Sequence, residues 1–391
     1  MLSYFNFLMN KIYLFTAAFA VMASLSGCSD TELASIDTAQ EKTPIGFHTV
    51  GSQMESRATI INSADITKTD FKVYAFDAAG NAFMGNNDNT EEDAYAHNGV
   101  RIMHDPTNNT WKYANEADIR YWPEKTPLNF YAVNPGPVVT EDNEYDLKVH
   151  YRWKINNDAQ TITYTSFDEY KTAGGNQNLD VMYAVAKNQT NSNGGKVNLT
   201  FKHILSQVLF KAKTNDDKLE VEINGIKFHN FQTGGTFTIP AGEPQRTDWS
   251  QPGSAQNTFT VGMDGTAKIT NTGIDVFTKP MLFVPQVLNP WVPSEKSIAD
   301  ADIAKLTYLE ISCRIKQNDT YLFGKDDFKT LYVPFSATWE PGKRYVYTLI
   351  FGGGYTDQGE QILTPINFTA SADEWTADKG NSTNENDKVI Q

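Results

Sequence analysis

The chain has 391 residues, and its 47 acidic side chains outnumber its 33 basic ones, which gives a formal net charge of −14 at pH 7. This negative charge argues against nucleic acid as a partner, because negatively charged phosphates attract positively charged proteins. Two cysteines in a chain of this length also cannot form the framework of a disulfide-rich scaffold.

The N-terminus has the pattern of a secretory signal. Residues 12–26 (IYLFTAAFAVMASLS) form an apolar run that follows a short start with one positive charge, Lys11. The run has the length of a signal-peptide core and is too short and too poorly flanked for a transmembrane helix. It ends in Leu25-Ser26-Gly27-Cys28, which resembles the lipobox of bacterial lipoproteins. The resemblance implies that residues 1–27 are removed and that Cys28 is acylated; the alternative is an ordinary signal peptide with an incidental cysteine.

Removal of residues 1–27 leaves 364 residues with a net charge of −15, because Lys11 is lost. This length exceeds what one hydrophobic core usually serves, so we expect two domains. Attachment to the outer membrane would come from the lipid, since the chain has no basic excess, and several acyl chains make such an anchor stable. Residues 28–43 are polar and are predicted to form a tether. Within them, Ser29-Asp30-Thr31-Glu32 resembles the acidic signal that directs Bacteroidetes lipoproteins to the cell surface.

Beyond the tether, apolar residues recur with a period of two. The segments are rich in β-branched and aromatic residues and are separated by turn formers. They are 71–76, 127–133, 196–213, 219–228, 236–240, 281–285, 308–316, 330–335 and 344–351. The best helical candidate is 298–309, which could also be a short connection. The pattern predicts an all-β chain of two antiparallel β-sandwich domains in tandem.

The domain boundary is predicted at 188–195 (NQTNSNGG), the most loop-like stretch near the middle of the mature chain. The N-terminal domain would then span 44–195 and the C-terminal domain 196–375. A polar tail, 376–391, follows.

No motif in the sequence indicates catalysis, a metal site or a cofactor. In the segment 308–316, Cys313 alternates with polar residues and is predicted to be a buried thiol. His48 and His203 lie in strand-like runs, where a structural role is expected. The acidic loop 88–93 lacks the ordered spacing of a calcium loop. We therefore predict that the protein is not an enzyme, although a spatial pair of glycosidase carboxylates would leave no sequence signal.

Seven phrases, taken in order, resemble the fimbrillin family, the FimA- and Mfa-like subunits of type V pili in Bacteroidetes. They are PIGFHT (44–49), SRAT (56–59), WKYANEADIRYWPEKTPLNFYAVNP (111–135), LDVMYA (179–184), VNLTFKHILSQVLFKAK (197–213), WEPGKRYVYTLIF (339–351) and INFTASADEW (366–375). The resemblance implies Greek-key, transthyretin-like sandwiches and a surface fimbrium that serves adhesion or biofilm formation.

Family members of this kind are exported as lipoproteins, cut after an arginine and assembled by donor-strand exchange. Here the resemblance implies cleavage between Arg57 and Ala58, which would release the N-terminal strand near 43–50. Without the family, Arg57 would be an ordinary loop arginine. The implied donor strand is 361–375, and the even spacing of its anchors Ile362, Ile366, Phe368 and Ala370 predicts that they share one face. The rival interpretation is that this segment is the last strand of its own domain.

The expected partners are other pilus subunits, the outer membrane through the lipid, and a host or bacterial surface ligand. A second hypothesis is a surface lipoprotein that binds glycan or host protein without polymerising. Its platforms would be exposed aromatic side chains such as Trp153, Trp249 or Trp291. A glycosidase ranks third, because no site for it is apparent.

Overall fold

Strands make up the regular structure, as predicted, and short 3-10 turns are the only helical elements among the described residues. The computed structural model describes residues 42–50, 66–85, 99–135, 151–156, 158–165, 169–171, 180–250, 256–263, 265–277, 280–300, 303–363, 367–374 and 388–389. Cys28, Arg57, Ala58, Ile366 and the loop 88–93 lie outside these ranges.

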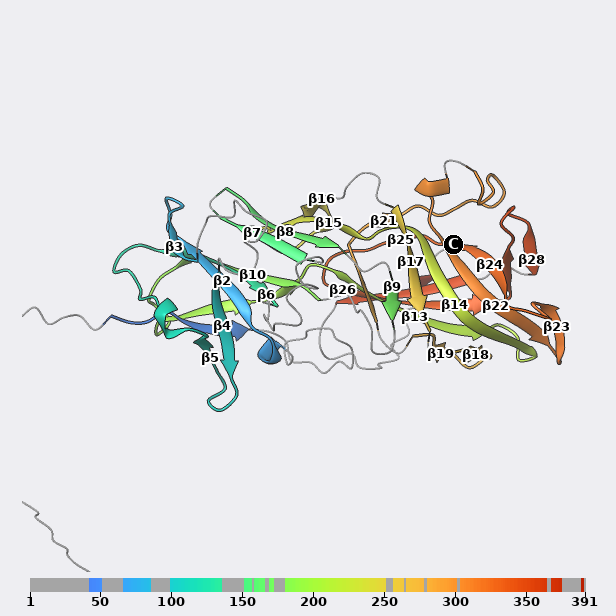
Figure 1. Cartoon of the computed structure of the whole chain (residues 1–391), viewed down its shortest axis with the longest axis horizontal. Helices are drawn as coiled ribbons and strands as arrows, with labels where there is room; N and C mark the ends of the chain where they lie inside the picture. The colour runs from blue at the N-terminus through green and yellow to red at the C-terminus, as the bar shows by residue number, and fades with distance from the viewer. Residues whose placement is uncertain are drawn as a thin grey trace, which may run out of the picture. The chain divides into compact units, whose positions relative to one another are not determined.

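A seven-stranded sheet forms the centre of the N-terminal half, with the order β12-β10-β6-β2-β4-β5 and with β3 paired to β2 (Figure 1). Its strands are β2 (Phe71–Phe76), β3 (Ala82–Met84), β4 (Val100–Asp105), β5 (Thr110–Tyr113), β6 (Leu128–Asn134), β10 (Met182–Gln189) and β12 (Lys202–His203). Its pairings are antiparallel.

Both faces of this sheet are covered. All six residues of β2 are buried, and its side chains divide by alternation between two cores. Phe71, Val73 and Ala75 lie in one core, whereas Tyr74 and Phe76 lie in the other. A strand buried on both faces has an almost continuous apolar sequence, which is what FKVYAF shows.

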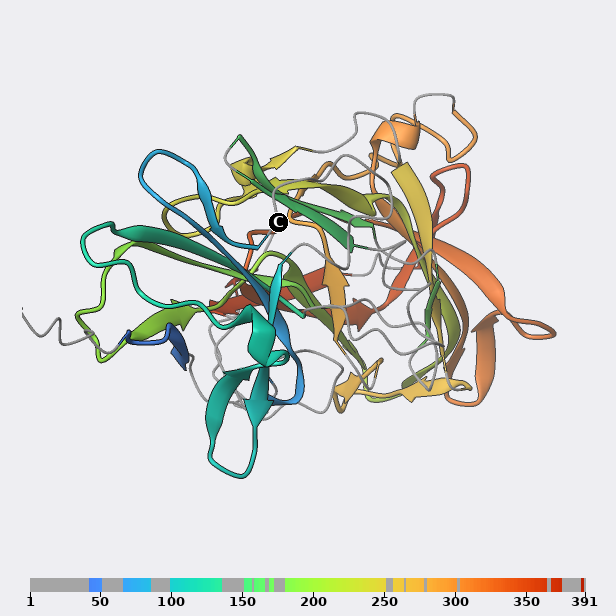
Figure 2. The same ribbon diagram turned by 60° about the vertical axis from the view of Figure 1, so that its left-hand side comes forward.

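Two smaller sheets provide the covers. One is the pair β1 (Gly46–Val50) and β11 (Lys196–Thr200). The other has the order β16-β15-β8-β7, and Figure 2 shows its green strands β7 and β8 layered against the sheet that contains the blue strand β2. Its strands are β7 (Tyr151–Ile155), β8 (Gln160–Thr165), β15 (Gly234–Thr238) and β16 (Trp249–Ser250).

The C-terminal half is a sandwich of a six-stranded and a nine-stranded sheet. The first contains β13 (Ser206–Thr214), β19 (Ile274–Asp275), β20 (Met281–Phe283), β26 (Lys343–Phe351), β29 (Asn367–Glu374) and β30 (Lys388–Val389). The second contains β9 (Glu169–Lys171), β14 (Leu219–Gln232), β17 (Gln256–Gly262), β18 (Ala267–Ile269), β22 (Tyr308–Gln317), β23 (Thr320–Phe323), β24 (Lys329–Pro334), β27 (Gly353–Tyr355) and β28 (Gln361–Leu363). A large aromatic core lies between them, with Phe210 in ring contact with Phe228, Phe335 and Tyr347.

The alternating pattern of β22 places its apolar side chains in the core. Leu309, Ile311, Cys313 and Ile315 are fully buried in the C-terminal core, and the residues between them are only partly buried. The prediction for Cys313 is therefore confirmed. Burial away from water raises the pKa of its thiol to about 12, so the thiol stays protonated at neutral pH.

Several strand pairs cross the predicted boundary at 188–195. The pair β15 with β8 and the parallel pair β9 with β17 each join residues from its two sides. The pairs β1 with β11 and β13 with β26 are also parallel. Contacts group Lys42–Gln391 into one compact unit. The division into two domains stays a prediction.

The connections contain the 3-10 turns η1 (Ile66–Lys68), η3 (Glu116–Asp118), η4 (Arg246–Asp248) and η5 (Ile303–Lys305) and the small sheet of β21 (Val287–Leu288) with β25 (Ala337–Thr338). The helical candidate 298–309 is thus a connection with one 3-10 turn, and its last residues already belong to β22. In the part of the chain that the structure describes, no helix has the length and apolarity needed to cross a membrane.

A charged cluster lies on the outer face of the nine-stranded sheet. Glu310 on β22 accepts hydrogen bonds from Lys227 Nζ at 2.8 Å and contacts His229 Nε2 at 2.7 Å. The His229 ring also stacks on Tyr308, with the centroids 4.5 Å apart. The hydrogen bond to His229, followed by that to Lys227, lowers the pKa of Glu310 from 4.5 to about 2.

We predict that this cluster contributes to acid stability. Because folding lowers the pKa of Glu310, its contribution is complete above about pH 4.5 and is lost as the pH falls towards 2. Glu310→Gln should therefore lose less unfolding free energy than the wild type between these pH values, as measured by urea denaturation. His229→Asn keeps the carboxylate but removes its strongest partner, so the folded-state pKa of Glu310 should lie closer to 4.5 and this variant should also lose less unfolding free energy than the wild type. Equal slopes for all three proteins would contradict the prediction.

Candidate assembly groove at the N-terminal strand

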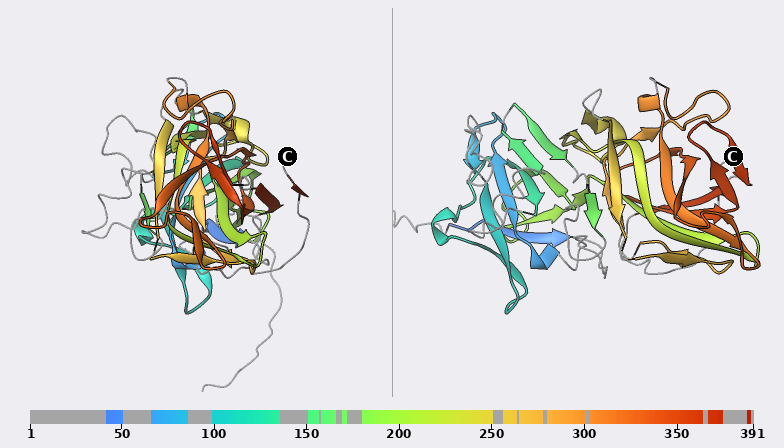
Figure 3. Two further views of the ribbon diagram at one scale, coloured as in Figure 1. Left: turned by 90° about the vertical axis from the view of Figure 1, so that its right-hand side faces the viewer. Right: turned by 45° about the vertical axis from the view of Figure 1, so that its right-hand side comes forward.

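The N-terminal segment 43–50 forms a strand that is attached to the rest of the fold in an unusual way. β1 runs parallel to β11, with Gly46 opposite Lys196 and His48 opposite Asn198 (Figure 3, right). Pro44 precedes the strand and makes an isolated bridge with Tyr121 on the other side. The segment therefore lies in a groove between β11 and the chain around residue 121, which we call the N-terminal groove.

Two large side chains fill the floor of the N-terminal groove. Ile45 and Phe47 are only 1% and 5% exposed, and they point into the core that covers β2 and β6. The Phe47 ring lies 6.2 Å from those of Phe71 and Phe130 and 6.0 Å from that of Tyr113. Burying two such side chains is worth roughly 1.5–3 kcal/mol each.

Main-chain hydrogen bonds hold the segment on both sides. Ile45 N–H donates to the Arg120 carbonyl at 2.8 Å, and Gly46 N–H donates to the Gly195 carbonyl at 2.8 Å. Trp122 N–H donates to the carbonyl of Thr43 at 3.0 Å. These bonds use atoms that almost any strand supplies, so they hold a strand without selecting its sequence.

Aromatic residues of β5 add two side-chain bonds. Tyr113 Oη donates to the Ile45 carbonyl at 2.9 Å, and the Trp111 indole N–H donates to Thr49 Oγ1 at 3.0 Å. Neither residue is predicted from the sequence to contact the N-terminal segment. The alternation of TWKY (110–113) indicates a strand, but it does not show that the strand faces the N-terminal segment.

Gly195 was predicted only as part of a loop, yet it forms the tightest point of the groove. A Cβ atom there would lie 2.7 Å from Thr43 Cγ2 and 2.9 Å from the Pro44 carbonyl oxygen, and its φ of 79° also disfavours other residues. The close approach of the segment thus depends on a glycine at this position.

The predicted donor segment 361–375 is not one strand, which corrects the expectation of four anchors on one face. Ile362 lies in β28 and pairs with Gly354 in the nine-stranded sheet. Phe368 and Ala370 lie in β29 of the six-stranded sheet, opposite Leu349 and Tyr347 of β26. In the sequence, Pro365 stands between the two strands, and proline cannot donate to a strand ladder. In this structure β29 is a strand of its own sandwich.

The tryptophans expected as glycan platforms are buried. Trp153, Trp249 and Trp291 are 6%, 7% and 1% exposed, respectively. Their indole N–H groups donate to Tyr74 Oη, the Ile204 carbonyl and the Lys296 carbonyl. The expectation that these aromatic side chains form a binding surface is wrong, because all three are core residues.

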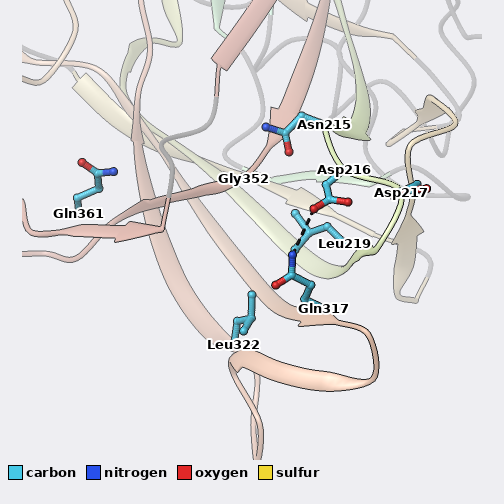
Figure 4. A pocket seen from close by; sticks show the side chains of 8 residues that line it. All are labelled: Asn215, Asp216, Asp217, Leu219, Gln317, Leu322, Gly352 and Gln361. Atoms are coloured by element: carbon cyan, nitrogen blue, oxygen red, sulfur yellow. Dashed lines mark hydrogen bonds between the residues drawn. The ribbon is translucent and has the colours of Figure 1, made fainter.

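An open hollow of about 930 Å³ lies at the end of the C-terminal sandwich, and Figure 4 shows its lining. Asp216 accepts a hydrogen bond from Gln317 Nε2 at 3.2 Å, and the backbone N–H of Lys218 is the main cause of the lowered pKa of Asp216. The lining also includes Asp217, Asn215 and Leu322. No histidine or cysteine is among the described residues that line it.

The two histidines of the strand-like runs lie in different surroundings. His203 Nδ1 contacts the buried carboxylate of Asp180 at 3.0 Å, and His48 is exposed on β1. Across the residues whose positions are described, no group of three or more His, Cys, Asp or Glu side chains could hold a metal ion. The N-terminal groove, in which the structure places the strand β1, is the candidate site.

The sequence profile of the fimbrillin-like family matches residues 56–375. A crystal structure of a fimbrial protein from Bacteroides vulgatus superposes with a TM-score of 0.53 and 16% identity, covering 85% of this chain and 99% of that one. A Bacteroides uniformis protein assigned to cell adhesion superposes with a TM-score of 0.44 and 13% identity, covering 85% of this chain and 100% of that one. The tip fimbrial protein Mfa3 from Porphyromonas gingivalis superposes with a TM-score of 0.37 and 11% identity, covering 78% of this chain and 94% of that one.

No curated protein sequence matches the chain significantly. The family match covers most of its length, and the Bacteroides vulgatus structure shares its fold. The chain belongs to the fimbrillin-like family.

Proposed function

We propose that the protein is a pilus subunit, exported as a lipoprotein acylated at Cys28, activated by cleavage after Arg57 and polymerised by donor-strand exchange. One observation carries the proposal. The segment 43–50 fills an apolar groove, and Arg57 follows it by a few residues in the sequence.

Cleavage between Arg57 and Ala58 would change how β1 is held. In the intact chain, residues 51–65 connect the strand to the rest of the fold, so it occupies its groove at a high effective concentration. After the cut, only two buried side chains and the hydrogen bonds of the groove retain it. A strand from another subunit can then compete for the same backbone partners and pockets, as in other cases of strand addition.

Donation of the proposed segment costs free energy, because β29 must leave its own sheet. β29 pairs with β26 from Lys343 opposite Glu374 to Ile350 opposite Asn367, so donation requires its release from that edge. The short strand β30 also pairs with β29 at Thr369 and Ala370. Assembly would therefore join two events, the opening of the N-terminal groove and the release of the C-terminal strand.

The partners in this proposal are other pilus subunits, and the lipid on Cys28 holds the precursor at the outer membrane before assembly. A structural fibre subunit needs no catalytic group. The runner-up function, a non-polymerising surface lipoprotein, has no specific observation in its favour, since Trp153, Trp249 and Trp291 are buried.

We predict that Arg57→Ala blocks assembly. The uncut chain keeps β1 in place, so the variant should remain a folded monomer with the melting temperature of the wild-type precursor. Trypsin-treated wild type should form ladders on a gel, and mass spectrometry should give Ala58 as the new N-terminus. Arg57→Lys, which trypsin still cleaves, should assemble normally. Normal ladders from Arg57→Ala would show that this arginine is not the switch.

We predict that Cys28→Ala abolishes acylation and leaves unprocessed precursor, because its thiol is the only proposed attachment point. Incorporation of labelled palmitate measures acylation, and the mass of the protein in the membrane fraction distinguishes precursor from mature protein. Cys313→Ala is the matched control: it removes the other cysteine, which is buried, and should keep full labelling. Membrane-bound, mature protein at wild-type levels from Cys28→Ala would rule out the lipobox.

A further inference from the structure

The two ends of the mature chain contain nearly the same five residues. Residues 43–47 are Thr-Pro-Ile-Gly-Phe, and residues 364–368 are Thr-Pro-Ile-Asn-Phe. Only Gly46 and Asn367 differ. The first stretch fills the N-terminal groove, whereas the second lies in the proposed donor segment.

We propose that residues 364–368 of a second copy of this chain occupy the N-terminal groove residue for residue, in place of 43–47 and in the same direction. Ile366 takes the site of Ile45, and Phe368 takes the site of Phe47. The inference rests on the proposed function and adds the partner, the register and the strand direction.

The groove accepts the one residue that differs. A Cβ atom on Gly46 would lie 3.4 Å from Lys196 Cγ and 3.8 Å from the Gly195 carbonyl oxygen, which are ordinary contacts. Gly46 is also absent from the glycines with positive φ, so an asparagine there meets no backbone strain. The side chain of Asn367 can therefore occupy position 46 of the groove, beside β11.

The second copy can also make the same main-chain bonds. The groove uses the carbonyl at position 43 and the N–H groups at 45 and 46. Thr364, Ile366 and Asn367 supply these groups. Position 44 needs no N–H, and both stretches have proline there.

Side-chain size fixes the register. A shift by one residue would turn the apolar side chains away from the core, since neighbouring residues face opposite sides. A shift by two would place Phe368 in the site of Ile45 and Ala370 in that of Phe47, which overfills one pocket and leaves a cavity in the other. Only the matched register puts identical side chains into both pockets.

The second copy makes one bond fewer than the original strand. Thr49 accepts a hydrogen bond from Trp111, and in the matched register Ala370 stands in its place. The incoming strand therefore has no advantage over an attached β1, which explains why cleavage must come first.

Engineered disulfides test the register. In the matched register Thr369 replaces His48 and lies opposite Asn198, and His48 and Asn198 are both exposed. The full-length double variant Asn198→Cys/Thr369→Cys should form reducible, covalently linked ladders after trypsin treatment and oxidation, because adjacent strands lie about 4.8 Å apart. Asn198→Cys/Ser371→Cys, which reports a shift by two, should form none. The uncut variant His48→Cys/Asn198→Cys should close an internal disulfide and serves as the geometric control.

The outcomes separate the two proposals. If cut wild type forms no ladders, donor-strand assembly is wrong and this inference falls with it. If wild type forms ladders but the Ser371 pair links, or neither pair links while the His48 control closes, assembly stands and the register proposed here is overturned.

A synthetic peptide of residues 361–375 gives a second test that does not depend on folding of the cysteine variants. In excess over cut wild type it should end chain growth, and the same peptide with Phe368→Ala should need at least about tenfold more, since burying a phenylalanine is worth more than 1.4 kcal/mol. Equal potency of the two peptides would contradict the assignment of Phe368 to the Phe47 site.

Discussion

The fold depends on the need to cover both faces of one central sheet. β2 and β6 carry apolar side chains on both faces, and even Lys72 of β2 is buried, donating to the Gly99 carbonyl at 3.3 Å, with its pKa lowered by desolvation. An uncovered face would leave several large aromatic rings in water. One face is covered by the sheet that contains β7 and β8, whereas β1 and β11 are the covering strands of the other face among the described residues.

This asymmetry gives the N-terminal segment its importance. The cover that β1 provides is small, ends near a polar stretch and is held by backbone groups together with two side chains. It belongs to a different core from the one on the opposite face, which another set of strands builds. The C-terminal sandwich has its own aromatic core and does not use β1 at all.

Local patterns in the sequence predicted much of the fold. The alternation in 308–316 predicted β22 and the burial of Cys313, and the aromatic and β-branched run 344–351 predicted β26. The prediction failed where burial depended on distant partners. The alternative hypothesis of a binding protein needed Trp153 at the surface, yet it packs in a core with Tyr74, 79 residues earlier, and no local pattern indicates that contact. Spacing also placed Ile362 and Phe368 on one face, but it ignored Pro365, and the two residues belong to different sheets.

The candidate site was predicted in part. PIGFHTV was recognised as a strand, because its pattern is local. Its parallel pairing with β11, about 150 residues later, and the walls built by Trp111, Tyr113 and Gly195 were not, since a groove is formed by segments that only the tertiary fold brings together.

The parallel pairing of β13 with β26 has a consequence for the order in which the chain can fold. Val208 pairs with Tyr345, so the C-terminal core cannot close until more than 340 residues have left the ribosome. Contacts so distant in sequence slow folding, because the entropy of closing the intervening loop is lost before the contacts form. A nascent chain of this topology stays extended for longer than a helical bundle of equal size. Under the export proposed above, slow closure would keep the chain unfolded while it passes through a secretion channel.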